Sequence, residues 1–220
     1  MRLYYHTLSA YLLECLQKLM ANTAFDDFVL VGGTALSLQR GHRMSNDIDL
    51  FTAIAYGSMN LEVIKNALTV SFPYIDNLEA FNERMPGYSV YIGNSKEKSV
   101  KLDLYYTENF IMPNVNQDGL RLASLQDIAG MKIQAIVNNK RKKDFWDIHE
   151  LLEHFTFKEM IQYGLQRNPF TLTENDILQS LYYAANLNQD NVIECLKGKY
   201  WELIVEDLRT IVENETQRFK

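Results

Sequence analysis

Two aspartates, Asp47 and Asp49, are separated only by the apolar residue Ile48, and more apolar residues follow them. Side chains alternate between the faces of a strand, so the two carboxylates share one face while Ile48 points to the core. Carboxylates this close repel each other unless a cation lies between them. Mg²⁺ or Mn²⁺ suits such oxygen ligands, so we expect this pair to bind one of these metal ions.

A third acid, Asp103, stands between apolar residues in the segment VKLDLYY, which also reads as a strand. Two-metal phosphoryl transfer uses carboxylates that bridge the metals and one that activates the attacking hydroxyl. We therefore expect Asp103 to act as the base or as a third metal ligand.

A diglycine, Gly32-Gly33, follows the apolar run Phe28 to Val31, and thirteen residues separate it from Asp47. Glycine at the start of a helix lets backbone N–H groups approach a phosphate near the positive end of the helix dipole. This predicts a phosphate-binding turn beside the acids.

Each of these features is common by itself. A diglycine is most often a plain turn, an Asp-x-Asp pair is often a surface feature, and Asp103 alone reads as an exposed strand residue. Their joint order is strand, diglycine, short helix, Asp-x-Asp strand and a later Asp-bearing strand. That order favours a phosphoryl-transfer site over three unrelated features.

Apolar periodicity divides the chain into two halves. The expected strands are 28–31, 48–52, 88–92 and 100–106, with a hairpin connection at 93–99. The expected helices are 5–19, 34–39, 61–70, 144–155, 173–186 and 200–219, with further helices capped by Ser124 and Asp127 and by Thr156 and Glu159. Strand signals stop near 117–124, so we expect an α+β domain at 1–120 and a helical domain at 121–220.

Composition narrows the class of protein. The net charge of −6 over 220 residues makes a broad basic surface for duplex DNA improbable, although a local basic cluster stands at Lys140 to Lys143. This cluster reads as a solvated helix junction or as an RNA contact. Two distant cysteines, no signal-peptide pattern and no long apolar run predict a cytoplasmic protein with no membrane partner.

The diglycine followed by Asp-x-Asp resembles the first motif of the polymerase-β nucleotidyltransferase superfamily. The segment GHRMSNDIDLF, with Arg43 and Ser45 ahead of the acids, resembles the AbiEii-type nucleotidyltransferase toxins, which belong to type IV toxin–antitoxin and abortive-infection systems and include the MenT toxins. The segments DIAGMKIQAI, with Lys132, and KKDFWDIHELL, with Lys143, Asp144 and Asp147, resemble the third and fourth motifs of this group. The resemblance covers residues 28–155.

The resemblance implies a polymerase-β-like fold, with a mixed twisted sheet flanked by helices and a C-terminal helical bundle. It implies that Asp47 and Asp49 bind metal together with Asp103, that Lys132 contacts the triphosphate, and that Asp144 completes the site or holds Lys132. The residues expected to contact the nucleotide are Gly32, Gly33, Thr34, Arg43, Ser45 and Lys132.

Simpler roles stand beside several of these expectations. Lys132 could extend from a helix edge into solvent. Asp144 could serve only as a favourable charge near a helix start. Arg43 and His42 read equally well as phosphate contacts and as solvent-facing residues.

The expected reaction is transfer of a nucleoside monophosphate from an NTP to a hydroxyl acceptor with release of pyrophosphate. The resemblance points to the acceptor end of tRNA and to a cognate antitoxin encoded nearby. The alternatives are a protein or a small-molecule acceptor such as an aminoglycoside, or a nucleotide-binding partner module without catalysis.

Overall fold

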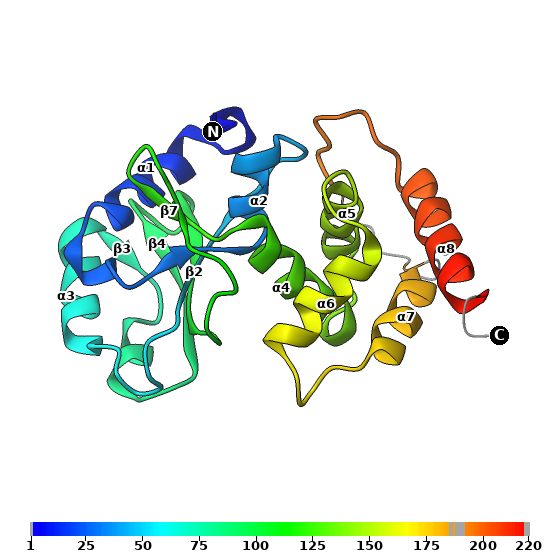
Figure 1. The fold of residues 1–220 in the computed structure, drawn as a ribbon. Coiled ribbons are helices and arrows are strands. Elements are labelled where there is room, and N and C mark those ends of the chain that lie inside the picture. The colour runs from blue at the N-terminus through cyan, green and yellow to red at the C-terminus, as the bar shows by residue number, and fades with distance from the viewer. Residues whose placement is uncertain (1, 185–186, 188–191, 218–220) are drawn as a thin grey trace.

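The computed structural model describes residues 2–184, 187 and 192–217 (Figure 1). The strands are β1 (Val29–Leu30), β2 (Asp47–Thr52), β3 (Tyr74–Ile75), β4 (Gly87–Gly93), β5 (Ser99–Tyr106), β6 (Val115–Gln117) and β7 (Leu120–Leu122). The α-helices are α1 (Ala10–Met20), α2 (Gly32–Arg40), α3 (Leu61–Ser71), α4 (Leu125–Asn138), α5 (Lys142–Leu151), α6 (Phe157–Arg167), α7 (Glu174–Tyr183) and α8 (Trp201–Gln217). Short 3-10 helices lie at Tyr5–Thr7, Thr23–Phe25 and Leu78–Asn82.

The strands form one mixed sheet in the order β3-β4-β5-β2-β1-β7-β6. β2 occupies the middle, antiparallel to β1 and parallel to β5. Ile48 and Leu50 of β2 and Leu102 and Leu104 of β5 are fully buried, and the residues between them face the opposite side of the sheet. The central strand pair therefore presents one apolar face to the core and one polar face to the cleft described below.

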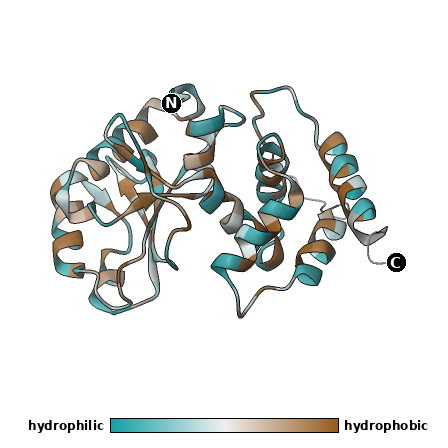
Figure 2. Ribbon diagram, viewed as in Figure 1, coloured by the Kyte–Doolittle hydropathy of each residue, from teal (hydrophilic) through white to brown (hydrophobic). Residues whose placement is uncertain are grey.

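Helices cover the sheet on both sides. In Figure 1, α1 and α3 lie on one side of the strands, and α4 to α8 form a group on the other side, in which α4 is nearest the strands. α2 contacts both β2 and α4. Figure 2 shows that most helices are brown on one side and teal on the other, which is the pattern of helices packed on a core through one face. The α+β fold with a C-terminal group of helices is confirmed.

Several element boundaries differ from the sequence-based expectation. The first α-helix begins at Ala10, because the Ser9 side chain accepts a hydrogen bond from the N–H of Leu12 and caps it there, so Tyr5–Thr7 is a separate 3-10 turn. The predicted caps at Ser124 and Thr156 are confirmed, the latter as a full capping box with Glu159. Parts of the predicted helices 173–186 and 200–219 lie outside the described residues.

The hairpin β6–β7 is absent from the sequence-based assignment, in which strand signals stop near residue 117. Its turn is formed by Asp118 and Gly119, both with positive φ (53° and 78°). An Asp-Gly pair between short alternating segments is a hairpin signal, and it was missed because each strand has only three residues. β7 pairs with β1 through Leu122 and Leu30, so the hairpin extends the sheet beyond β1.

Among the described residues, every helix is too short or too polar to traverse a lipid bilayer.

Candidate active site

A cleft of about 500 Å³ lies between the polar face of the central strands and α4. Its walls include the three aspartates of β2 and β5, the glycines at the start of α2, and residues from α4, the α4–α5 junction and α5. The side chains and glycines that line the cleft include Gly32, Gly33, Arg43, Ser45, Asp47, Asp49, Phe51, Lys101, Asp103, Tyr105, Lys132, Gln134, Arg141, Lys143 and Asp144.

The strand register brings the three predicted carboxylates together. Asp49 and Asp103 are cross-strand partners on the parallel strands β2 and β5, and Asp47 stands opposite Lys101 on the same face. Burial, followed by the negative charge of Asp103, raises the pKa of Asp49 to about 6. The geometry therefore concentrates negative charge on one small area of the sheet, as the alternation of residues predicts.

Two lysines partly neutralise this charge. Lys101 Nζ lies 2.5 Å from Asp103 Oδ2, and Lys143 Nζ lies 3.2 Å from Asp47 Oδ2. Ser89 on β4 also donates a hydrogen bond to Asp103 Oδ1, at 2.5 Å. The sequence-based site lacked Lys101, although its position two residues before Asp103 on one strand placed both side chains on one face.

The diglycine is required because side chains of the site lie against its backbone. Gly32 has a φ of +66°, and a Cβ there would lie 2.4 Å from Asp49 Oδ2. A Cβ on Gly33 would lie 2.4 Å from Arg43 Nη2. The N-terminus of α2 is thus in direct contact with both the acids and a guanidinium, while phosphate contact by the two glycines stays a prediction.

Thr34 and Ser45 fasten α2 to the start of β2. Their hydroxyl oxygens lie 2.9 Å apart, and Thr34 also donates a hydrogen bond to the backbone carbonyl of Asp47. Ser45 reaches the cleft wall, whereas Thr34 is fully buried beneath it. Six residues were predicted to contact the nucleotide. Thr34 is the one among them that the structure does not bring to the cleft surface.

A buried carboxylate, Asp147 on α5, binds three side chains from two segments, the loop before β2 and α4. Arg43 binds it through two hydrogen bonds, Nε to Oδ1 at 2.7 Å and Nη2 to Oδ2 at 2.8 Å. His42 Nε2 lies 2.8 Å from Oδ1, and Lys132 Nζ lies 2.6 Å from Oδ2. Burial by itself would raise the pKa of Asp147, but Arg43 and Lys132 hold this pKa well below its usual range.

A second buried carboxylate, Asp144, completes this charge cluster. Lys132 Nζ lies 2.7 Å from its Oδ1, and Arg141 Nε lies 2.8 Å from its Oδ2. Lys132 is 5% exposed and is therefore an interior residue of the cleft wall, not a solvent-facing one. Asp144 therefore holds Lys132 in place, and it is more than a favourable charge near the start of a helix. His42 and Arg43 are likewise buried against Asp147, so the solvent-facing alternative for them is wrong.

A segment from the C-terminal part of the chain fixes the loop that carries Arg43. We name residues 192–199 the strap. Its backbone pairs with this loop through Met44 N–H to the carbonyl of Glu194 (3.0 Å) and Leu196 N–H to the carbonyl of His42 (2.9 Å). The loop before β2 is therefore held between α5 and the strap.

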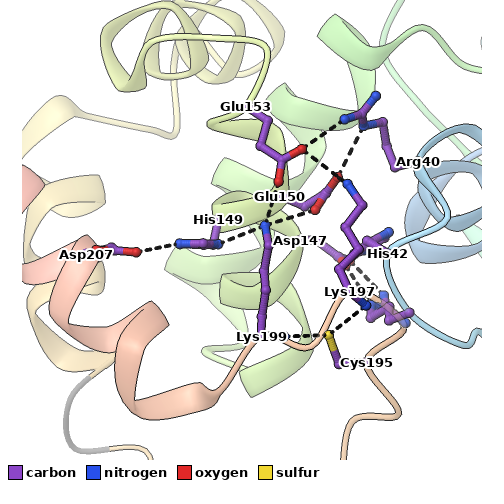
Figure 3. Close-up of polar contacts among 11 residues, drawn as sticks. Arg40, His42, Asp147, His149, Glu150, Glu153, Cys195, Lys197, Lys199 and Asp207 are labelled. Carbon is purple, nitrogen blue, oxygen red and sulfur yellow. Dashed lines mark hydrogen bonds and ion pairs between the residues drawn. The ribbon is translucent and has the colours of Figure 1, made fainter.

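Charged contacts hold the strap itself in place (Figure 3). Lys197 and Lys199 bind Glu150 of α5 at 2.5 Å and 3.1 Å, and Arg40 of α2 binds the same carboxylate at 3.2 Å. Glu150 is fully buried, so its charge is balanced by these three cations rather than by solvent. Its partners lie 47 to 110 residues away in sequence, so no local pattern indicated them.

Comparison with known proteins identifies the fold first. The crystal structure of JHP933 from Helicobacter pylori superposes with a TM-score of 0.54 over 94% of this chain and 90% of that one, at 18% identity. The structure of MenT4, the nucleotidyltransferase toxin Rv2826c from Mycobacterium tuberculosis H37Rv, superposes with a TM-score of 0.56 over 94% and 85% of the two chains, at 10% identity. The protein shares its fold with this nucleotidyltransferase toxin.

The sequence identifies the family. The protein aq_aa25 from Aquifex aeolicus (strain VF5) is 27% identical in an alignment 203 residues long, which covers 88% of this chain and 90% of the relative. Residues 14–180 match the family described as nucleotidyl transferase AbiEii toxin, type IV TA system. The chain belongs to this family, and it is a nucleotidyltransferase.

Removing the charge of Asp147 should destabilise the fold. The variant Asp147→Asn leaves Arg43 and Lys132 buried without their main counter-charge, and breaking a buried pair costs about 3–5 kcal/mol. The control Asp207→Asn removes an acid that is 63% exposed and pairs with His149 at the surface, so it should change stability by less than about 0.5 kcal/mol. Urea unfolding midpoints measure both, and equal midpoints would contradict the role given to Asp147.

Adding a methyl group at Gly32 should disturb the acids specifically. Gly32→Ala places Cβ against Asp49, whereas Gly119→Ala, at a similar positive φ of +78°, meets no atom within 4 Å. Both variants bear the left-handed strain of about 1–2 kcal/mol. Only Gly32→Ala should lose a further ~1–3 kcal/mol from overpacking, together with nucleotidyl transfer. Thermal unfolding and transfer rates measured side by side check this, and two equally active variants would refute it.

Proposed function

We propose that the protein transfers a nucleoside monophosphate from an NTP to a hydroxyl acceptor, with release of pyrophosphate, at the cleft of β2, β5 and α4. The observation that carries this proposal is the convergence of Asp47, Asp49 and Asp103 on one face of adjacent strands, beside the N-terminus of α2. We further propose that residues 1–120 and 121–220 act as two units that enclose this cleft.

The acids are suited to a divalent metal ion, although they do not form a finished cage. No three acidic, imidazole or thiol side chains in the described ranges are arranged as a ready metal site. The donor set nevertheless fits Mg²⁺ or Mn²⁺, because three carboxylates share one face and two of them are balanced only by lysines from the cleft wall. Asp47, Asp49 and Asp103 would hold the ion, which when bound neutralises triphosphate charge and orients the α-phosphate.

Asp103 would draw the proton from the acceptor hydroxyl. The acceptor oxygen forms a bond to the α-phosphorus as the bond from that phosphorus to pyrophosphate breaks, and the hydroxyl proton passes to a carboxylate oxygen of Asp103. Ser89 and Lys101 orient this carboxylate. A base held in a fixed position lowers the barrier chiefly through proximity and orientation.

The cations of the cleft are suited to the triphosphate. Lys132 and Arg43 are anchored by Asp144 and Asp147, so they reach the cleft in fixed positions. Preorganised cations stabilise charge that develops on transferring phosphoryl groups without reorganising during the reaction. Asp144 then serves as a positioning residue for Lys132.

We propose the acceptor end of tRNA as the acceptor, which would make the protein a toxin that blocks translation and is countered by a cognate antitoxin. The family supports the toxin and antitoxin assignment. The local basic cluster supports a polyanionic acceptor, because Arg141 and Lys143 stand at the cleft edge despite the net charge of −6. Both cysteines are free thiols, which suits the reducing cytoplasm that we propose as the compartment.

Labelling with radioactive NTPs tests the reaction and the acceptor together. The protein is incubated with each labelled NTP and total tRNA, then with protein extract or an aminoglycoside. We expect label on tRNA, with Asp49→Asn reducing it by roughly 10²–10³-fold or more. The control Asp26→Asn changes an acid that is 64% exposed and outside the cleft, and should leave labelling unchanged.

The other results each decide between alternatives. Label on protein or drug alone would replace tRNA as the acceptor. Binding of NTP without transfer to any acceptor would favour a non-catalytic module. Undiminished labelling by Asp49→Asn would refute the site itself.

Metal removal gives an independent check. Dialysis against EDTA should abolish labelling, and Mg²⁺ or Mn²⁺ should restore it, because the acids otherwise repel the triphosphate. The Asp26→Asn control should respond to EDTA as the wild type does. Full activity after complete chelation would rule out the proposed metal role.

A further inference from the structure

The two ends of the cleft differ in chemistry. The end nearest Asp47 carries Arg43, Arg141 and Lys143. The other end is built mainly from aromatic and uncharged polar side chains, and the arginine present there, Arg167, is paired with Asp127 at 2.7 Å. A nucleoside triphosphate is asymmetric in the same way, with a polyanion at one end and an uncharged ring at the other.

An aromatic surface follows directly after the acids on the same strands. Phe51 and Tyr105 stand two residues beyond Asp49 and Asp103, on the same face, and are cross-strand partners. Their ring centroids are 5.8 Å apart with the planes tilted by 50°, so a planar group can stack on one ring and contact the other at an angle; both residues line the cleft. We name this pair the aromatic floor.

The aromatic floor is held rigidly. The Tyr105 ring lies over Gly87 of β4 so closely that a Cβ there would be 2.0 Å from it. The hydroxyl of Tyr105 lies 3.3 Å from that of Ser89, the residue that also binds Asp103. The ring is thus fixed relative to the proposed base, as a platform for a bound planar group should be.

The side-chain amide of a residue on α4 lines the uncharged end of the cleft beside the aromatic floor. Gln134 lines the cleft and also the adjoining hollow that includes Phe51 and Thr107. Its side chain forms no hydrogen bond to any described residue, whereas Lys132 on the same helix binds Asp144 and Asp147. A glutamine amide offers both donors and an acceptor, so it can distinguish the edges of different nucleobases.

We propose that the nucleobase of the NTP stacks on the aromatic floor and that Gln134 selects among the four bases. This inference rests on the proposed function. With the triphosphate at the cationic end and the α-phosphate at the acids, the nucleoside must extend along β2 and β5. Phe51 and Tyr105 lie one two-residue step, roughly 6.6 Å, beyond the acids in that direction.

A second hollow of about 450 Å³ opens from the cationic end, lined by Arg141, Lys142 and Lys143 and by residues of the strap. It shares Arg43 and Asp47 with the cleft, so it reaches the acids from the side opposite the aromatic floor. The cations of this hollow extend the end that takes the triphosphate, which leaves the aromatic floor for the nucleoside of the NTP.

Calorimetric titration with the four NTPs in Mg²⁺, and with inorganic tripolyphosphate as a base-free probe, tests this assignment. Phe51→Leu should weaken NTP binding about tenfold, since aromatic stacking of a base is lost, while tripolyphosphate binding stays unchanged. Gln134→Met, which keeps side-chain length, should compress the spread of Kd among the four NTPs. The matched control Tyr91→Leu removes an exposed aromatic on the same sheet, outside the cleft, and should change neither.

Three results would overturn the proposal. Equal weakening of NTP and tripolyphosphate by Phe51→Leu would show a structural role for the ring. If Phe51→Leu left NTP binding unchanged but reduced tRNA labelling, the aromatic floor would be assigned to the acceptor. Equal affinity of the wild type for all four NTPs would remove the role of Gln134. Binding requires no transfer, so wild-type protein that binds NTPs as expected but labels no acceptor counts against the proposed function alone.

Discussion

The site depends on one buried charge, the carboxylate of Asp147. A buried carboxylate is costly unless its oxygens are paired, and here Arg43, His42 and Lys132 pair them. These partners come from the loop before β2 and from α4, while Asp147 belongs to α5. The same contacts that satisfy the carboxylate therefore hold the helices against the sheet and bring two cations to the cleft. Stability and site geometry are coupled through this one residue.

Around this anchor, the cleft is an arrangement of unlike charges, of which Asp47, Lys143 and Lys101 stay partly exposed to solvent. Asp49 of β2 lies against Gly32, and Lys101 and Lys143 balance Asp103 and Asp47. A metal-bound triphosphate carries both signs of charge, so it can replace these internal pairs with equivalent ones. The lysine pairs explain why so acidic a face is tolerated in the free protein, and under the proposed function the metal-bound triphosphate would take their place.

How much of the site the sequence could predict depends on how far apart in the chain the interacting residues lie. Asp47, Asp49 and Asp103 could be placed on one face because strand alternation is a local rule. The partnership of Arg43 with Asp147 spans 104 residues, so the sequence indicated both residues but not their contact. The Asp118-Gly119 turn was readable and was missed, because strands of three residues carry too little periodicity to stand out.

Side chains alternate between the two faces of a strand, and this alternation places the acids on one face and also determines which residues lie next to them. Any residue two positions after Asp49 or Asp103 must face the cleft, and the chain places Phe51 and Tyr105 there rather than more charge. Gly87 makes room for one of these rings, so the neighbouring strand is adapted to them as well. A strand pair that needed only to hold metal would not require this arrangement. The sheet thus supplies both the acids that we propose to react and an aromatic surface next to them, and α4 lines the same cleft with Lys132 and Gln134.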